Sequence, residues 1–169
     1  FLLCGAMNPC PCGYFNVPNS QRECSCTPTV IARYQSKLSG PLMDRIDLYC
    51  SVSPVAYDEL KSEEESESSA EVLKRVVLAR EVQIRRFAEH ALQVNAEMTP
   101  KHIALFCQLD EQCQHTLKLA MKVHQLSARS YHRVLKVART IADLAGVENI
   151  SQDHLCEALQ YRHDVQKGL

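Results

Sequence analysis

The sequence predicts a mainly α protein, in which a helical bundle over residues 70–169 follows a short α/β segment over residues 1–60. Apolar residues recur at helical spacing after residue 70, whereas the earlier segment has short continuous apolar runs of the kind found in buried strands. Between the two parts, residues 61–69 are acidic and serine-rich without one apolar residue. That composition is typical of a solvated linker or loop, with an acidic docking segment as the alternative.

The first segment is expected to contain two buried strands and a helix. Residues 1–7 are apolar and end at Asn8, as in a strand of a parallel sheet. A helix over residues 28–38 begins with proline, which suits the first helical position. A compact turn or helix over 42–48 and a strand-like run over 48–52 follow. Since the neighbouring strands of such a sheet are missing from the chain, we expect unpaired apolar surface here.

Five helices are expected in the second part, and each begins at a capping signal. The expected first residues or caps are, in chain order, Ser68 or Ser69, Thr99, Asp110, Ser127 and Ser151. Gly146 is expected to close the fourth helix. The long first helix has a broad apolar face made of Leu73, Val76, Val77, Ile84 and Phe87. Amphipathic helices of this kind are expected to pack as a compact bundle.

Two Cys-x-Cys pairs lie near the start of the chain, Cys10 with Cys12 and Cys24 with Cys26. Two close thiol pairs joined by a short polar loop can supply all four ligands of a tetrahedral zinc site. The spacing is less usual than Cys-x-x-Cys, but Gly13 can adopt the positive φ that turns both thiols of a pair toward one ion. The alternatives are disulfides or four unrelated thiols.

The cysteine count favours a reduced protein. The chain has nine cysteines, an odd number, which is not the pattern of a secreted disulfide framework. No segment has the composition of a signal peptide or of a membrane span. We therefore expect a cytoplasmic protein without a membrane partner. The remaining cysteines are expected to pack as small apolar side chains: Cys4, Cys50, Cys107, Cys113 and Cys156.

The charges are distributed unevenly. Residues 1–71 hold 5 Lys or Arg against 10 Asp or Glu, whereas residues 72–169 hold 14 against 10. The fourth helix carries Arg129, Arg133 and Lys136 on one face, with Arg139 one turn further. A solvated basic face and a phosphate-binding face are both open readings of this pattern. Arg129 lies in the first turn, where helix amides favour anions.

Several segments together point to one known family. They are Ala6-Met7-Asn8-Pro9-Cys10-Pro11-Cys12-Gly13-Tyr14, Cys24-Ser25-Cys26-Thr27, Arg33-Tyr34, residues 39–48 (SGPLMDRIDL) and residues 127–144 (SARSYHRVLKVARTIADL). These segments closely resemble the ComM/YifB family, whose members are bacterial magnesium-chelatase-like AAA+ ATPases linked to natural transformation and DNA processing. The resemblance covers nearly the whole chain apart from the acidic run and the extreme C-terminus. It implies a helical AAA+ lid over residues 70–169, preceded by part of the AAA+ ATPase core.

The resemblance implies roles for individual residues. Asn8 matches the sensor 1 position, which orients the water that attacks the γ-phosphate of ATP. Arg45 matches the arginine finger, which reaches the nucleotide of the neighbouring subunit. Arg129 matches the sensor 2 arginine of the lid, and Arg133 is a second candidate for nucleotide contact. Such cations would stabilise the charge that develops during phosphoryl transfer.

Simpler interpretations remain for two of these residues. Asn8 can cap the turn before Pro9, because asparagine often does so. Arg45 can form a local ion pair with Asp44 or Asp47.

A phosphate-binding loop of the form Gly-x-x-x-x-Gly-Lys-[Ser/Thr] does not occur in the sequence, which has five glycines. No apolar strand ends in the acidic pair that would hold Mg²⁺. We therefore expect the chain to be the C-terminal part of a longer protein whose cofactors are ATP and Mg²⁺. This part alone is expected not to hydrolyse ATP.

The leading hypothesis is a ring of identical subunits, hexameric with nucleotide, that acts on single-stranded or branched DNA in a helicase-like or branch-migration role. In each subunit of this ring, a structural Zn²⁺ would lie between the sensor strand and the helix that leads to Arg45. One alternative is a non-enzymatic, zinc-stabilised module that binds nucleic acid or protein. The other is a magnesium chelatase ATPase subunit, for which the sequence offers no porphyrin-binding signal.

Overall fold

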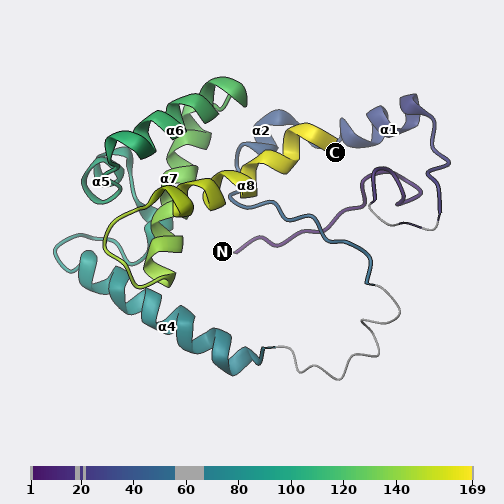
Figure 1. The fold of residues 1–169 in the computed structure, drawn as a ribbon. Coiled ribbons are helices and arrows are strands. Elements are labelled where there is room, and N and C mark those ends of the chain that lie inside the picture. The colour runs from purple at the N-terminus through teal and green to yellow at the C-terminus, as the bar shows by residue number, and fades with distance from the viewer. Residues whose placement is uncertain (1, 18–19, 21, 56–66, 169) are drawn as a thin grey trace. The chain divides into compact units, whose positions relative to one another are not determined.

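The computed structural model describes residues 2–17, 20, 22–55 and 67–168, with side chains described as far as residue 162 in the last helix. The chain divides into two compact units, residues 1–63 with 164–169, and residues 64–163. The regular elements of the described residues are helices (Figure 1), so the predicted mainly α class is confirmed. The predicted segment boundaries stay a prediction, and residues 61–66 of the acidic run lie outside the described residues.

The first unit contains two short helices. Helix α1 spans Pro28–Gln35 and begins with proline, as predicted, but ends three residues before the expected position. Helix α2 spans Gly40–Met43, and the Ser39 hydroxyl accepts a hydrogen bond from the N–H of Leu42 at 3.3 Å. The buried apolar side chains of these helices are Ile31 and Met43.

The two strands expected in the first unit are not present in the described residues. Residues 2–7 and 48–52 have no regular secondary structure. A strand is stabilised by hydrogen bonds to a neighbouring strand, and the described part of this unit provides none. Their apolar side chains are consequently exposed, Leu2 at 94% and Val52 at 91%. The expectation of unpaired apolar surface is thus confirmed, whereas the strand assignments are wrong.

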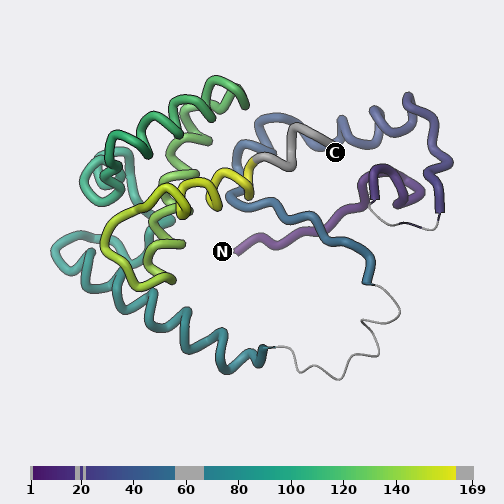
Figure 2. Tube along the Cα trace, viewed as in Figure 1, coloured from purple at the N-terminus to yellow at the C-terminus, as the bar shows by residue number. Residues whose placement is uncertain are grey.

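All five predicted helices are present: the second unit contains four of them, most of the fifth, and one additional 3-10 turn. The residues predicted as caps stand at the starts of these helices. At one of them, the Asp110 carboxylate accepts a hydrogen bond from the N–H of Cys113 at 2.7 Å. The Ser68 hydroxyl and Glu71 form a reciprocal capping box. The elements can be followed along the trace in Figure 2: α4 (Ser69–Arg86), η1 (Asn95–Glu97), α5 (Pro100–Phe106), α6 (Glu111–Val123), α7 (Ala128–Leu144) and α8 (Gln152–Gly168).

Helix α7 is the centre of the second unit, because it contacts α4, α5 and η1. Its buried side chains include Val134, Leu135 and Ala138, which belong to one apolar core cluster with residues of the surrounding helices. Gly146 follows the helix with φ +70°, and its N–H donates to the carbonyl of Asp143 at 3.1 Å. The predicted closing glycine is therefore correct.

The apolar face predicted for α4 is only partly buried. Phe87, at the end of the helix, is 1% exposed, whereas Leu73 and Ile84 are 60% and 61% exposed. The buried positions of α4 itself are Ala79 and Gln83, both in its second half. Periodicity identified the apolar side chains of this face, but it did not show which of them another helix covers.

A pair of identical substitutions tests this division of buried and exposed surface. Val134→Ala should lower the free energy of unfolding of the second unit by about 2 kcal/mol, since Val134 is 0% exposed. Val77→Ala, at a helical position that is 45% exposed, should change it by less than about 0.5 kcal/mol. Urea unfolding followed by circular dichroism measures both values. Equal losses would show that α4 is buried along its whole length.

A buried polar network links α4, η1 and α7. The guanidinium of Arg86 pairs with the carboxylate of Asp143, whose side chain is 0% exposed. The Nε of Arg139 donates to the same carboxylate at 3.1 Å, and the Nδ2 of Asn95 donates to it at 2.7 Å. Each oxygen of Asp143 therefore has a donor, as a buried carboxylate requires.

Candidate metal centre and nucleotide-sensing residues

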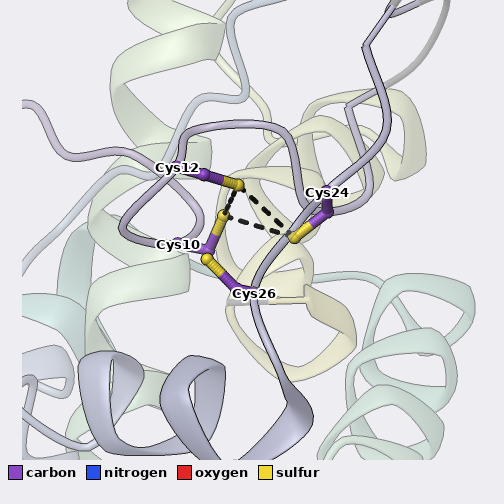
Figure 3. A group of neighbouring side chains, drawn as sticks. All are labelled: Cys10, Cys12, Cys24 and Cys26. Atoms are coloured by element: carbon purple, nitrogen blue, oxygen red, sulfur yellow. Dashed lines mark hydrogen bonds between the residues drawn. The ribbon is translucent and has the colours of Figure 1, made fainter.

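The four thiols of the Cys-x-Cys pairs converge on one point (Figure 3). Their sulfur atoms all lie within 4.8 Å of one another. The Sγ of Cys10 is 3.3 Å from that of Cys12 and 3.7 Å from that of Cys24, and Cys12 and Cys24 are 3.5 Å apart. Four sulfurs around zinc at about 2.3 Å would be about 3.8 Å apart in a tetrahedron. The donor set and its size therefore fit a tetrahedral metal ion.

The local backbone explains why the first pair turns inward. The N–H of Gly13 donates to the carbonyl of Cys10 at 3.0 Å, which closes a turn around Cys12. Gly13 has φ +88°, a conformation that residues other than glycine rarely adopt, so the positive φ predicted for this residue is confirmed. The second pair ends directly before helix α1. The Nε2 of Gln35 in that helix donates to the carbonyl of Pro9 at 3.2 Å and joins the two parts of the cluster.

The electrostatics of the cluster favour a bound cation. The backbone N–H of Tyr14 lowers the pKa of Cys12 to about 5. The backbone N–H of Cys26 lowers the pKa of Cys24, but burial and the neighbouring thiols Cys12 and Cys10 outweigh it and raise that pKa to about 12. Once one thiolate has formed, its charge opposes ionisation of the next. A divalent cation between the sulfurs would remove this repulsion.

The other cysteines differ among themselves. Cys107 and Cys113 are buried, and burial raises the pKa of each to about 11. These two are small buried side chains, as predicted. Cys4 and Cys50 are exposed, contrary to the expected packing, because both lie in the segments that were expected to form strands.

The two candidate catalytic residues of the first unit are both exposed. Asn8 precedes the cysteine turn, and its Nδ2 lies 3.8 Å from the position that a Cβ on Gly13 would take. Its side chain thus lies against the backbone of the turn that carries Cys10 and Cys12. Arg45 follows Asp44, the C-cap of α2, and its Nη1 donates to the carbonyl of Pro41 at 2.7 Å. This bond holds one nitrogen of the guanidinium against α2, while the side chain as a whole stays exposed.

The basic residues of α7 do not form one uniform face. Arg129 is exposed in the first turn, and Arg133 is half-buried one turn later. Lys136 donates to the carbonyl of Ala96 at 2.7 Å. Arg139, which the spacing did not place on the face of the other three, is 3% exposed and belongs to the buried network around Asp143. Among the basic residues predicted to share one face of α7, Arg129 has an exposed side chain and lies at the start of the helix.

Sequence reasoning did not single out Arg162. The structure buries it in α8, where its Nη2 donates to the Ser130 hydroxyl at 2.7 Å. The sequence did contain a signal for the burial of Arg162, because this residue follows Leu155 by seven residues and Ala158 by four, which is helical spacing. Both of these side chains are 0% exposed. Helical spacing therefore placed Arg162 on the buried face of its helix.

Comparison with known families agrees with this architecture. The family model described as magnesium chelatase, subunit ChlI C-terminal, matches residues 66–162, and the model described as magnesium chelatase, subunit ChlI, matches residues 1–60. The first match covers more than half of the chain, so the chain belongs to this magnesium-chelatase-like AAA+ family. The resemblance to ComM and YifB is confirmed by individual relatives.

These relatives are similar over nearly the whole chain. Competence protein ComM of Haemophilus influenzae is 40% identical over 163 residues, which are 96% of this chain and 30% of the relative. The uncharacterized protein YifB is 39% identical in Salmonella typhimurium and 38% in Escherichia coli, over 96% of this chain and 31% of each relative. The chain therefore spans less than a third of the length of the curated relatives it matches.

Among the described residues, none of the helices combines the length and the apolar composition needed to cross a bilayer.

Proposed function

We propose that the chain supplies the sensor residues, the arginine finger and the helical lid of a ring-forming AAA+ ATPase. The observation that carries this proposal is the exposure of Arg45 and Arg129, at the positions that match the family's nucleotide-contacting arginines. Each is held at a defined point of the backbone, Arg45 next to the C-cap of α2 and Arg129 in the first turn of α7. Exposed guanidinium groups on ordered helix ends are suited to phosphate oxygens.

In this proposal each residue has one task during phosphoryl transfer. Arg129 contacts the γ-phosphate of the nucleotide bound by its own subunit, with Arg133 as a second contact. Arg45 reaches the nucleotide of the neighbouring subunit and stabilises the charge on the equatorial oxygens. Asn8 orients the attacking water with its side-chain amide. ATP and Mg²⁺ supply the transferred phosphoryl group and its charge neutralisation.

DNA is the proposed substrate of the motor. Two observations support it: the relative ComM is a competence protein, and residues 72–169 have an excess of basic over acidic residues, 14 against 10. A ring of identical subunits, hexameric with nucleotide, would move along single-stranded or branched DNA in a helicase-like or branch-migration role. Binding should then weaken steeply with salt, as phosphate contacts require.

The thiol cluster is proposed to hold a structural zinc ion. Cys10, Cys12, Cys24 and Cys26 would fill all four positions of a tetrahedral site, which leaves none for a substrate or water. The ion would fix the turn against which Asn8 lies and join it to α1. Its role would be to brace the sensor residue, because a closed four-thiolate site has no catalytic chemistry of its own.

Arg45→Ala tests the arginine-finger assignment in the whole protein that contains this chain. The variant should form rings and bind ATP with the parent affinity, yet its kcat for ATP hydrolysis should fall by about 10³-fold or more. Size-exclusion chromatography, nucleotide binding and a phosphate-release assay measure the three properties. Arg75→Ala, which removes an exposed arginine of α4 paired with Glu67, is the control and should keep the parent kcat.

Mixing subunits distinguishes a finger that acts on the neighbour from one that acts within its own subunit. Rings made from Arg45→Ala subunits and subunits that cannot bind nucleotide should regain part of the activity, because each supplies what the other lacks. Parent turnover by Arg45→Ala alone would contradict the assignment. Mixed rings that stay inactive would contradict action between subunits.

A further inference from the structure

Arg162 is a buried cation that none of the roles above uses. It lies on α8 and is 8% exposed. Burying a guanidinium is costly unless hydrogen bonds replace its lost water. One such bond is made by its Nη2, which donates to the hydroxyl oxygen of Ser130 at 2.7 Å. Ser130 is itself 2% exposed, so this bond is shielded from water.

Ser130 connects Arg162 to the cap of helix α7. The N–H of Ser130 donates to the Ser127 hydroxyl at 3.2 Å, which is the capping bond of the helix. The Ser127 hydroxyl in turn donates to the Ser130 hydroxyl at 3.3 Å. The Ser130 oxygen therefore accepts from both Ser127 and Arg162. A continuous chain of hydrogen bonds runs from α8 to the first turn of α7.

Arg129 lies inside the turn that this chain of bonds holds. It stands between Ser127 and Ser130, and its side chain is exposed whereas Ser130 is buried. First-turn residues of a helix are held by few backbone bonds, because the first four N–H groups have no partner within the helix. The direction in which Arg129 leaves the helix therefore depends on the bonds made by its neighbours.

We propose that Arg162 is a positioning residue for Arg129. Through Ser130 it fixes the first turn of α7, and so it sets the direction from which Arg129 approaches the phosphates of the nucleotide. The inference rests on the proposed sensor role of Arg129. Small misplacements of a charged contact are enough to reduce its effect on a bound phosphate.

The test uses steady-state ATP hydrolysis by the whole protein with single and double variants. Arg162→Gln should raise the KM for ATP about tenfold, in the range of coupling between contacting residues. Arg162→Lys keeps a cation and a donor and should restore the KM to within about threefold of the parent. Ser130→Ala removes the acceptor and should raise the KM as Arg162→Gln does. It serves as the second variant if Arg162→Gln folds poorly.

The decisive comparison is made in an Arg129→Ala background. If Arg162 acts through Arg129, adding Arg162→Gln to Arg129→Ala should raise the KM no further, whereas a purely structural role would add its effect in both backgrounds. Melting temperatures of all variants separate loss of folding from loss of binding. An unchanged KM in Arg162→Gln, or a further rise in the double variant, would overturn the positioning role.

The same set of variants separates this inference from the proposed function. An Arg129→Ala variant with the parent KM and kcat would contradict the sensor role and the positioning role together. An impaired Arg129→Ala beside a normal Arg162→Gln and Ser130→Ala would contradict only the positioning role. Arg75→Gln, at an exposed arginine of α4, is the matched control and should behave as the parent.

Discussion

Asp143→Ala should destabilise the second unit by about 3–5 kcal/mol, because it leaves buried cations without their counter-ion. The side chains of Arg86 and Arg139 are 13% and 4% exposed and both bind the carboxylate of Asp143. Burial already lowers the pKa of Arg139, and the charge of Asp143 opposes this effect. Asn95 would lose one of its hydrogen bonds as well, since its Nδ2 donates to the same carboxylate.

Thermal unfolding measures this loss. For a unit of this size, about 3–5 kcal/mol corresponds to a fall in Tm of roughly 12 °C or more. Asp153→Ala is the matched control, because Asp153 is an exposed carboxylate in the first turn of α8. Its loss should cost less than about 1 kcal/mol, the usual value for a charge at a helix end. An equal effect of both substitutions would show that the Asp143 network is open to water.

The helix starts of the second unit were predictable because capping is local. Ser68, Asp110 and Ser127 each accept a bond from an N–H within three residues, so the sequence alone contains both partners. The thiol cluster was predictable for a similar reason, since its ligands come from two short pairs only 14 residues apart. Neither case requires knowledge of the tertiary structure.

The buried network was not predictable, because its partners are distant in sequence. Arg86 and Asp143 are 57 residues apart, and each has the pattern of an ordinary surface charge on its own helix. For the same reason the burial of Arg139 could not be predicted from the pattern of its own helix. Helix α4 shows the opposite case, since Leu73 belongs to an apolar face and its side chain is nevertheless 60% exposed. Periodicity describes a helix face, whereas burial depends on what packs against it.

The first unit should depend on metal for its structure, and this prediction has the largest expected effect. Its buried apolar side chains among the described residues are Cys10, Ile31 and Met43, too few for an independent core. In a small module of this kind the free energy of zinc binding, about 10–16 kcal/mol, becomes free energy of folding. The purified protein should therefore contain about one zinc ion per chain.

The double variant Cys24→Ser, Cys26→Ser tests this dependence. It should lose the zinc, measured by elemental analysis, and the helical signal of α1 and α2, measured by hydrogen exchange, while the second unit keeps its protection. Cys4→Ser with Cys50→Ser is the matched control, because these thiols of the same unit are exposed. It should keep both metal and structure. A protein that is metal-free and still protects α1 would refute the site, and with it the brace proposed for Asn8.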